Sequence, residues 1–340
     1  MMKVASVGAG YFARFHHDGW SRMAGVEFTA ICDADIAKAE ASAREFGASR
    51  VFADIDSLIA ETRPDLIDIA TPPATHLPII RTCIDHNIPV ICQKPFCGGL
   101  AGAEEAVRLS ENSGVPVIVH ENFRFQPWFV EAERQLAAGA VGQPYQVTFR
   151  LRPGDGRGPD AYLDRQPYFQ QMERFLIHET AVHIIDVFRF LLGPVTAVTA
   201  QLTRLNPAIA GEDAGFILFD FASGARGLFD GNRLSSHAAE NRRRTMGEMW
   251  LEGSEAVLQL DGDGGLSLRP HDSNNPATID YDWQDSGFAG DCVYKLQRHV
   301  IDALAGGTRP ANTARDYLTN LRLVEAIYQS SAEGRRIEIN

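Results

Sequence analysis

The fold is decided by the segment Val4-Ala5-Ser6-Val7-Gly8-Ala9-Gly10-Tyr11-Phe12-Ala13. Its first four residues favour a strand, a Gly-x-Gly-x-x-Ala turn follows, and residues 11–23 have the pattern of a helix. The first glycine of such a turn permits a tight bend, the second lets the backbone approach a pyrophosphate, and the unpaired N–H groups of the helix face the negative charge. A strand-to-helix turn without a ligand is the alternative. The segment predicts a dinucleotide site that includes Gly8, Gly10, Tyr11, Phe12 and Ala13.

The second predicted strand ends on an acidic residue, Asp33, which lies twenty residues beyond Ala13. A carboxylate at this place can accept hydrogen bonds from the adenosine ribose hydroxyls, and it repels a 2′-phosphate. Ala34 follows, and no Arg or Lys stands beside Asp33 to neutralise an extra phosphate. We therefore expect NAD as the cofactor rather than NADP.

Residues 3–122 alternate short apolar runs with helical stretches, which is typical of a parallel sheet built from βαβ units. The sequence predicts an α/β Rossmann dinucleotide-binding domain over residues 1–122. Its strands are expected at 3–7, 28–33, 49–52, 66–71, 89–93 and 115–120.

The pattern changes after Asn122. An apolar helix over 177–192 is followed by β-runs that Gly-rich turns separate, as in an antiparallel sheet. We expect residues 123–340 to form an α+β domain with a large, open, mostly antiparallel sheet that binds the substrate. Its strands are predicted at 145–152, 195–204, 214–221, 227–232, 249–252 and 256–260, and two more helices at 291–304 and 313–331.

Size and charge restrict the partners. At 340 residues the chain exceeds the roughly 250 to 300 residues at which single cores stop growing, so two domains are expected. A net charge of −12 argues against a nucleic-acid partner, because such partners need clustered Lys and Arg. The one dense basic run, 242–244, is expected to be a solvated loop or a local anion anchor. No apolar run reaches the ~18 residues of a membrane span.

The N-terminus and the cysteines indicate the compartment. Met1-Met2-Lys3 leads straight into the first strand, without the apolar core and cleavage site of a signal peptide. The five cysteines are scattered and include no Cys-x-x-Cys pair. Both observations are typical of a cytoplasmic protein with reduced thiols.

Two further strand ends carry unusual residues, Thr71-Pro72-Pro73-Ala74-Thr75-His76 and Gln93-Lys94-Pro95. Ligands of open α/β sheets bind outside the carboxyl ends of the strands, so both segments belong at the cofactor edge. Pro95 restricts the backbone of Lys94 to an extended conformation, which suits a rigidly presented ammonium.

Polar residues also interrupt the apolar helix 177–192. Glu179, His183 and Asp186 are offset by four and three, so we expect them on one helix face, where they need partners or a wet cleft. A set of satisfied buried groups that ties the helix to the sheet is an equal alternative, and Asp186 fits that role best. A zinc site is not expected, because His178 and His183 are five residues apart and diverge by roughly 140° around a helix.

Together these segments resemble the glucose-fructose oxidoreductase / inositol dehydrogenase (Gfo/Idh/MocA) family over essentially the whole chain. The matching motifs are the glycine turn, Thr71 to His76, Gln93-Lys94-Pro95, Asn122-Phe123-Arg124-Phe125 and Glu179 to Asp186.

The resemblance implies an NAD-dependent oxidoreductase that transfers a hydride from a sugar or polyol hydroxyl to the nicotinamide. It implies that His183 is the general acid/base, that Lys94 polarises the substrate oxygen and that Glu179 binds or orients the substrate. Further residues are implied at the cofactor, namely Thr71, Pro72, His76, Gln93, Lys94 and Asn122, and at the substrate, namely Arg124 and Arg152. Two positions depart from the family pattern, since Gln93 replaces the usual Glu and Glu179 the usual Asp.

The segments 178–183, 206–213 and 229–233 also resemble the D-apiose dehydrogenases of this family. That resemblance implies oxidation of a branched furanose to a lactone, with hydroxyl contacts from the polar loop 152–164. Two other functions stay open: a non-catalytic sensor that binds the dinucleotide, and a reductase of a non-sugar carbonyl or a diol. The open sheet and the family resemblance favour a homodimer or homotetramer assembled through the C-terminal sheet.

Overall fold

The computed structural model describes residues 1–339 and contains two compact units. The first comprises residues 1–122 and 286–321, and the second comprises 123–285 together with the chain from Arg322 onward. The predicted division after Asn122 coincides with this boundary, but the segment 286–321 joins the first unit and not the second. The reason is side-chain bonding: the Gln297 amide donates to the His16 carbonyl oxygen at 3.0 Å, and the Asn312 amide to that of Glu121 at 2.7 Å.

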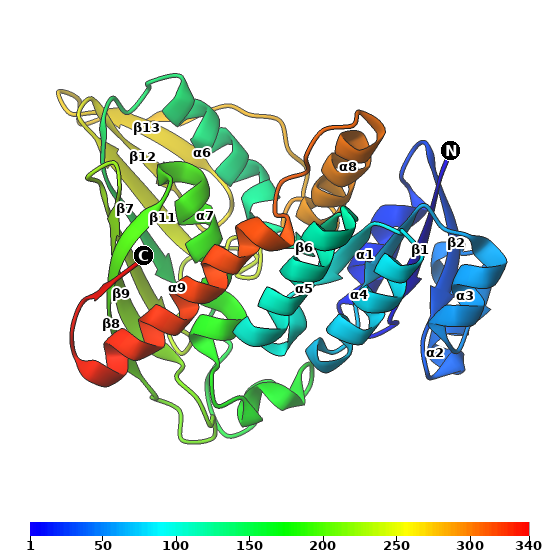
Figure 1. The fold of residues 1–340 in the computed structure, drawn as a ribbon. Helices are drawn as coiled ribbons and strands as arrows, with labels where there is room; N and C mark the ends of the chain where they lie inside the picture. The colour runs from blue at the N-terminus through cyan, green and yellow to red at the C-terminus, as the bar shows by residue number, and fades with distance from the viewer. Residues whose placement is uncertain (340) are drawn as a thin grey trace. The chain divides into compact units, whose positions relative to one another are not determined.

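The first unit contains a six-stranded, wholly parallel sheet in the order β3-β2-β1-β4-β5-β6 (Figure 1). The strand order reverses between β1 and β4, which is the switch point where dinucleotides bind in such sheets. All six predicted strands are confirmed to within two residues at each end. Their bounds are β1 Met2–Val7, β2 Val26–Cys32, β3 Arg50–Phe52, β4 Leu66–Ile69, β5 Val90–Gln93 and β6 Val117–His120.

Helices flank this sheet, and capping side chains and glycines determine where several of them begin and end. The Asp54 carboxylate accepts a hydrogen bond from the Ser57 N–H at 2.8 Å and caps one helix, while Gly47 and Gly114, each with a φ of 75°, end two others. The helices of the unit are α1 Ala13–Ser21, α2 Ile36–Phe46, α3 Ile55–Thr62, α4 His76–Asp85, α5 Leu100–Ser113 and α8 Cys292–Ala305.

The second unit contains a nine-stranded sheet in the order β14-β13-β12-β11-β7-β10-β9-β8-β15. Among the strands of residues 1–339 in this sheet, only β7 and β10 pair in parallel, so the prediction of a mostly antiparallel sheet is confirmed. The strands are β7 Pro144–Leu151, β8 Val195–Thr203, β9 Ala214–Phe221, β10 Arg226–Asn232, β11 Gly247–Gly253, β12 Ala256–Leu260, β13 Leu266–Pro270, β14 Ala277–Ile279 and β15 Ile337–Glu338.

Helices α6 (Pro127–Ala137) and α7 (Val182–Leu192) pack on one face of this sheet (Figure 1). Rings interlock across the contact: Phe129 lies 6.3 Å from Phe149, and Phe188 lies 5.6 Å from Phe219, measured between ring centroids. α9 (Ala314–Glu333) continues into this unit, where the Ser330 hydroxyl accepts a bond from the N–H of Ala200.

Several elements differ from the predictions. Helix α6 and the strands β13, β14 and β15 were not expected, and β14 is a three-residue strand that pairs with β13. The predicted helix 177–192 is present, but its first turn, Leu176–Ala181, is π-helical and only the remainder is α7. Within residues 1–339, no helix is long and apolar enough to cross a membrane.

Candidate functional site

The glycine turn follows β1 directly, at the switch point of the parallel sheet. The Gly8 N–H donates to the carbonyl oxygen of Cys32 at 2.7 Å, and its φ of +109° is one that side chains rarely adopt. A Cβ on Gly8 would lie 2.6 Å from the Ala70 oxygen, whereas a Cβ on Gly10 would meet no atom within 4 Å. The first glycine therefore serves the fold, and the second keeps space open beside the N-terminus of α1. This arrangement fits a pyrophosphate.

Asp33 lies against the same turn. Its Oδ2 accepts a hydrogen bond from the Ala9 N–H at 2.7 Å, and its Oδ1 accepts one from the Asp35 N–H at 2.9 Å. The ends of β1 and β2 thus hold the carboxylate beside the glycine turn, where NAD would place its adenosine ribose.

His76 connects two loops at this edge. Its Nδ1 accepts a hydrogen bond from the Cys97 N–H at 3.3 Å, so its Nε2 donates to the Thr71 carbonyl oxygen at 2.9 Å. Burial lowers the pKa of His76, in keeping with a neutral ring. Both ring nitrogens are used inside the unit, so His76 joins the loop after β4 to the loop after β5. The contact of His76 with the cofactor stays a prediction.

Lys94 directly follows β5 and is half-buried, and its peptide bond to Pro95 is cis. The Gln93 side chain accepts a hydrogen bond from the Lys94 N–H at 2.7 Å. Gln93 therefore fixes the backbone of Lys94, a task that does not need the charge of a glutamate. At the end of β6 the buried Asn122 amide donates to Cys292 Sγ at 3.1 Å.

In the second unit the π-helical turn carries Glu179, whereas His183 and Asp186 lie in α7. π-helical turns within helices occur frequently at functional sites. Because a π turn contains more residues than an α turn, the prediction that regular α-helical spacing aligns Glu179 with His183 needs correction. The polar groups are nevertheless all provided with partners, as the interior of a unit demands.

His183 is held by a residue that the sequence reasoning missed. The rings of Phe123 and His183 are stacked, with centroids 4.0 Å apart and planes inclined by 5°. Phe123 lies in the motif 122–125, but the motif by itself does not show which of its members would contact the helix. The stack fixes the plane of the imidazole.

Arg124 and Asp186 form a two-pronged ion pair. Arg124 Nε lies 2.7 Å from Asp186 Oδ2, and Nη2 lies 2.6 Å from Oδ1. Asp186 is fully buried, and the guanidinium also lies over the ring of Phe190 at 5.3 Å. Asp186 thus has the structural role expected of it, and Arg124 is its partner. The contact of Arg124 with substrate stays a prediction.

Arg152 is likewise engaged within its unit. Its Nη2 donates to Asp230 Oδ2 at 2.5 Å and its Nη1 to the Asp230 carbonyl oxygen at 2.6 Å, so the guanidinium joins the end of β7 to β10. The contact of Arg152 with substrate stays a prediction.

In the basic run 242–244, Arg244 forms ion pairs with Asp263 and Asp285 and so connects two loops.

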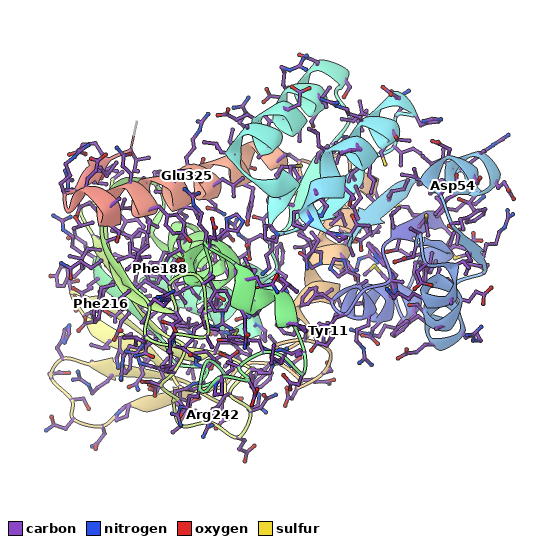
Figure 2. All side chains as sticks on the ribbon, turned by 90° about the horizontal axis from the view of Figure 1, so that it is seen from below. Tyr11, Asp54, Phe188, Phe216, Arg242 and Glu325 are labelled. Carbon is purple, nitrogen blue, oxygen red and sulfur yellow. The ribbon has the colours of Figure 1, made fainter. Side chains whose placement is uncertain are left out.

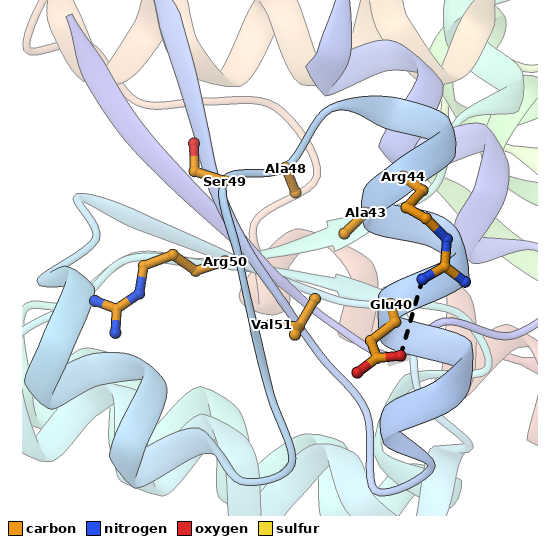
Figure 3. A pocket seen from close by; sticks show the side chains of 7 residues that line it. All are labelled: Glu40, Ala43, Arg44, Ala48, Ser49, Arg50 and Val51. Atoms are coloured by element: carbon orange, nitrogen blue, oxygen red, sulfur yellow. Dashed lines mark ion pairs between the residues drawn. The ribbon is translucent and has the colours of Figure 1, made fainter.

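A hollow between α2 and β3 lies elsewhere in the first unit (Figure 3). It is lined by the C-terminal part of α2 and the start of β3. These segments lie at the amino ends of the parallel strands, whereas the glycine turn follows the carboxyl end of β1. Arg44 and Glu40 on its wall form an ion pair of 3.8 Å. The hollow is therefore separate from the cofactor edge. Among residues 1–339, no group of three or more His, Cys, Asp or Glu side chains could hold a metal ion.

An open parallel sheet with a glycine turn at its switch point and an aspartate at the end of its second strand is typical of NAD-binding domains. Comparison with known families agrees. Residues 2–121 match the oxidoreductase family with an NAD-binding Rossmann fold, and residues 129–257 match the GFO/IDH/MocA C-terminal domain. The chain belongs to the GFO/IDH/MocA family, and NAD is its cofactor.

Relatives match along nearly the whole chain. A D-apiose dehydrogenase of Paraburkholderia graminis is 36% identical over 99% of this chain and 89% of its own length, and one of Rhizobium rhizogenes is 32% identical over 99% and 97%. Among solved structures, an oxidoreductase of Agrobacterium radiobacter in complex with NAD⁺, L-tartaric acid and magnesium has a TM-score of 0.87 and 31% identity, with 99% of this chain and 98% of that chain covered.

Proposed function

We propose that the protein is an NAD-dependent dehydrogenase of a sugar or polyol hydroxyl, and that it oxidises an aldose such as D-apiose to a lactone. The observation that carries the proposal is the match over 99% of the chain to two D-apiose dehydrogenases. The presence of Lys94 and His183, the two residues that such a reaction needs, supports it.

When bound, NAD supplies the hydride acceptor, which is C4 of its nicotinamide. His183 takes the proton of the substrate hydroxyl and so acts as the general base. The ammonium of Lys94 supplies the positive charge that stabilises a developing alkoxide. The substrate carbon loses its hydrogen as hydride and the oxygen loses its proton, so the carbonyl of the lactone forms. Glu179 accepts a hydrogen bond from another hydroxyl and orients the sugar.

A substrate panel tests the proposal. The purified enzyme is mixed with NAD and D-apiose, other aldoses or polyols, and NADH is followed by its absorbance. Turnover of D-apiose is expected, whereas NAD binding without turnover of any compound would favour the sensor. A parallel assay mixes the enzyme with NADH and non-sugar carbonyls, and NADH oxidation there without turnover of any sugar would favour the reductase.

The role of His183 has its own test. His183→Ala should lower kcat by roughly 10²- to 10⁴-fold without changing the Kd of NAD, because a general base is lost. His271→Ala is the matched control, since His271 is an exposed histidine of the same unit. Near-normal turnover by His183→Ala would contradict the assigned role.

We further propose that two copies of the chain associate through the outer face of the nine-stranded sheet. Phe216 (labelled in Figure 2) and Leu218 on β9 are 55% and 53% exposed. Leu218 pairs in register with Leu228, which in turn pairs with Thr148. Thr148 pairs with Trp250 on β11, so the apolar stripe crosses four strands. A two-fold related copy could bury this stripe against itself.

Light scattering on the eluting protein tests this assembly. Leu218→Arg should convert the homodimer to a monomer, and a homotetramer to a smaller species, because a charge is placed in the stripe. Ile36→Arg, which changes an exposed apolar residue of the first unit, should keep the native mass. A wild-type monomer would overturn the proposal.

A further inference from the structure

A buried arginine lies behind Glu179. Arg233 immediately follows β10, and it is 1% exposed. Its guanidinium lies over three aromatic rings, with distances to the centroids of 5.1 Å for Tyr162, 5.7 Å for Phe169 and 4.6 Å for Phe175. These rings belong to one buried apolar cluster. Ring faces attract cations, so the cluster holds the guanidinium in a single place.

The donors of this guanidinium face two carboxylates. Nη2 of Arg233 lies 2.9 Å from Asp155 Oδ2, and Nη1 lies 3.4 Å from Glu179 Oε2. Arg165 Nη2 also contacts Asp155, at 3.2 Å. Two cations therefore balance two anions, as the burial of such charges requires. The segment before the π-helical turn and the strand β10 are both tied to Glu179 through Arg233.

Thr180 closes the connection. Its hydroxyl accepts a hydrogen bond from Arg233 Nη1 at 2.5 Å and donates one to Glu179 Oε2 at 2.5 Å. Thr180 is 1% exposed, so no solvent competes for these bonds. One oxygen of the Glu179 carboxylate thus receives two donors, and the plane of the carboxylate is set by them.

We infer that Arg233 and Thr180 are positioning residues, which orient the Glu179 carboxylate toward a hydroxyl of the substrate. The inference rests on the substrate-binding role of Glu179 in the proposed function. It also accounts for a departure from the family pattern. Glutamate is one methylene longer than aspartate, and at position 179 its Oε2 lies 2.5 Å from the Thr180 hydroxyl and 3.4 Å from Arg233 Nη1.

The pair Thr180→Val and Thr180→Ser tests the inference at nearly constant volume. Valine removes the hydroxyl and serine keeps it. Thr180→Val should raise the KM for D-apiose about tenfold and change kcat much less, because ground-state orientation is lost. The Kd of NAD should stay the same, and Thr180→Ser should behave as the wild type. Equal KM values for the two variants and the wild type would overturn the inference.

A second substitution keeps the test independent of how well Thr180→Val folds. Arg233→Lys removes the planar fork, so a single ammonium cannot serve Asp155 and Thr180 together. It should raise the KM for D-apiose at least as much as Thr180→Val. Arg226→Lys is the matched control, since Arg226 is an exposed arginine on the same strand that pairs with Asp220 at 3.1 Å. A role confined to stability would lower Tm in Arg233→Lys and leave KM unchanged.

Crystal structures of the two Thr180 variants separate this inference from the proposed function. In Thr180→Val the Glu179 carboxylate should turn away from position 180, and in Thr180→Ser it should keep its orientation. If the wild type oxidises no sugar, the proposed function fails, while these structures still decide whether Thr180 orients Glu179. An unchanged carboxylate in Thr180→Val would overturn the inference.

Discussion

The glycine turn of the first unit and the start of α7 in the second unit are built in opposite ways. Around Gly8 the backbone provides the geometry, and the side chain of Asp33 is held by the N–H groups of Ala9 and Asp35. Around Glu179 and His183 side chains provide it, and those of Arg233 and Phe123 come from distant parts of the sequence. A site made of backbone tolerates few changes in its glycines, whereas a site made of side chains depends on pairs that substitutions can separate.

The largest effect is expected at the glycine turn. Gly8→Ala should lower the free energy of unfolding by roughly 3 kcal/mol or more, because its Cβ would lie 2.6 Å from the Ala70 oxygen at a strained φ. Thermal unfolding of the cofactor-free protein measures this.

Gly10→Ala is the matched control for the fold. A Cβ on Gly10 would meet no atom within 4 Å, so Tm without cofactor should stay that of the wild type. The Kd of NAD should nevertheless rise by at least about tenfold, because the methyl group would occupy the place of the pyrophosphate. Unchanged NAD binding by Gly10→Ala would place the pyrophosphate elsewhere.

The same contrast explains what the sequence could predict. The glycine turn, Asp33 and Lys94 could be predicted from the sequence, because each lies at the end of a strand in a βαβ unit and the spacing within such a unit is local. The roles of Phe123 and Arg233 were not readable, because stacking on His183 and bonding to Thr180 depend on the packing of segments far apart in the chain. The sequence motif 122–125 identified Arg124 as a candidate site residue, but the motif did not reveal its ion pair with the buried Asp186.

The second effect concerns that ion pair. Arg124→Met should lower the free energy of unfolding by about 3 kcal/mol, because Asp186 is fully buried and would lose its guanidinium. The double variant Arg124→Met/Asp186→Leu should recover much of that loss, since a pair of apolar residues needs no counter-charge. Urea unfolding of the single and double variants provides the numbers. A harmless Arg124→Met would show that the pair does not hold α7.

The third effect concerns stability in acid, where the first unit also depends on a buried side chain, that of His17. His17 on α1 lies 2.9 Å from the Ser6 hydroxyl and 2.6 Å from that of Ser42, and burial, with the neighbouring His16, lowers its pKa to about 4. Above the unfolded pKa of about 6.5 the ring is neutral in both states and adds no pH dependence. As the pH falls from 6.5 toward 4, the unfolded chain binds the proton first, so stability is lost.

Urea unfolding at two pH values measures this loss. Between pH 7 and pH 5 it should amount to about 2 kcal/mol for His17, and His17→Gln should lack that part of the pH dependence. Other groups titrate equally in both proteins, so the difference between them isolates His17. The same pH dependence in the variant would show that this histidine does not limit stability in acid.

The smallest effect concerns the two predicted roles of Asp33, which are to bind the ribose hydroxyls of NAD and to exclude the 2′-phosphate of NADP. Asp33→Ser should weaken NAD binding by about tenfold, or about 1.4 kcal/mol, because the ribose hydroxyls lose a charged acceptor. NADP binding should strengthen in the same variant, since the repulsion of a 2′-phosphate is removed. The Ala9 N–H would also lose its partner, so a small drop in Tm is expected. Asp35→Ser is the control, because the Asp35 carboxylate pairs with Lys38 and not with the glycine turn. An unchanged preference for NAD over NADP in Asp33→Ser would mean that the glycine turn, and not the carboxylate beside it, carries the discrimination.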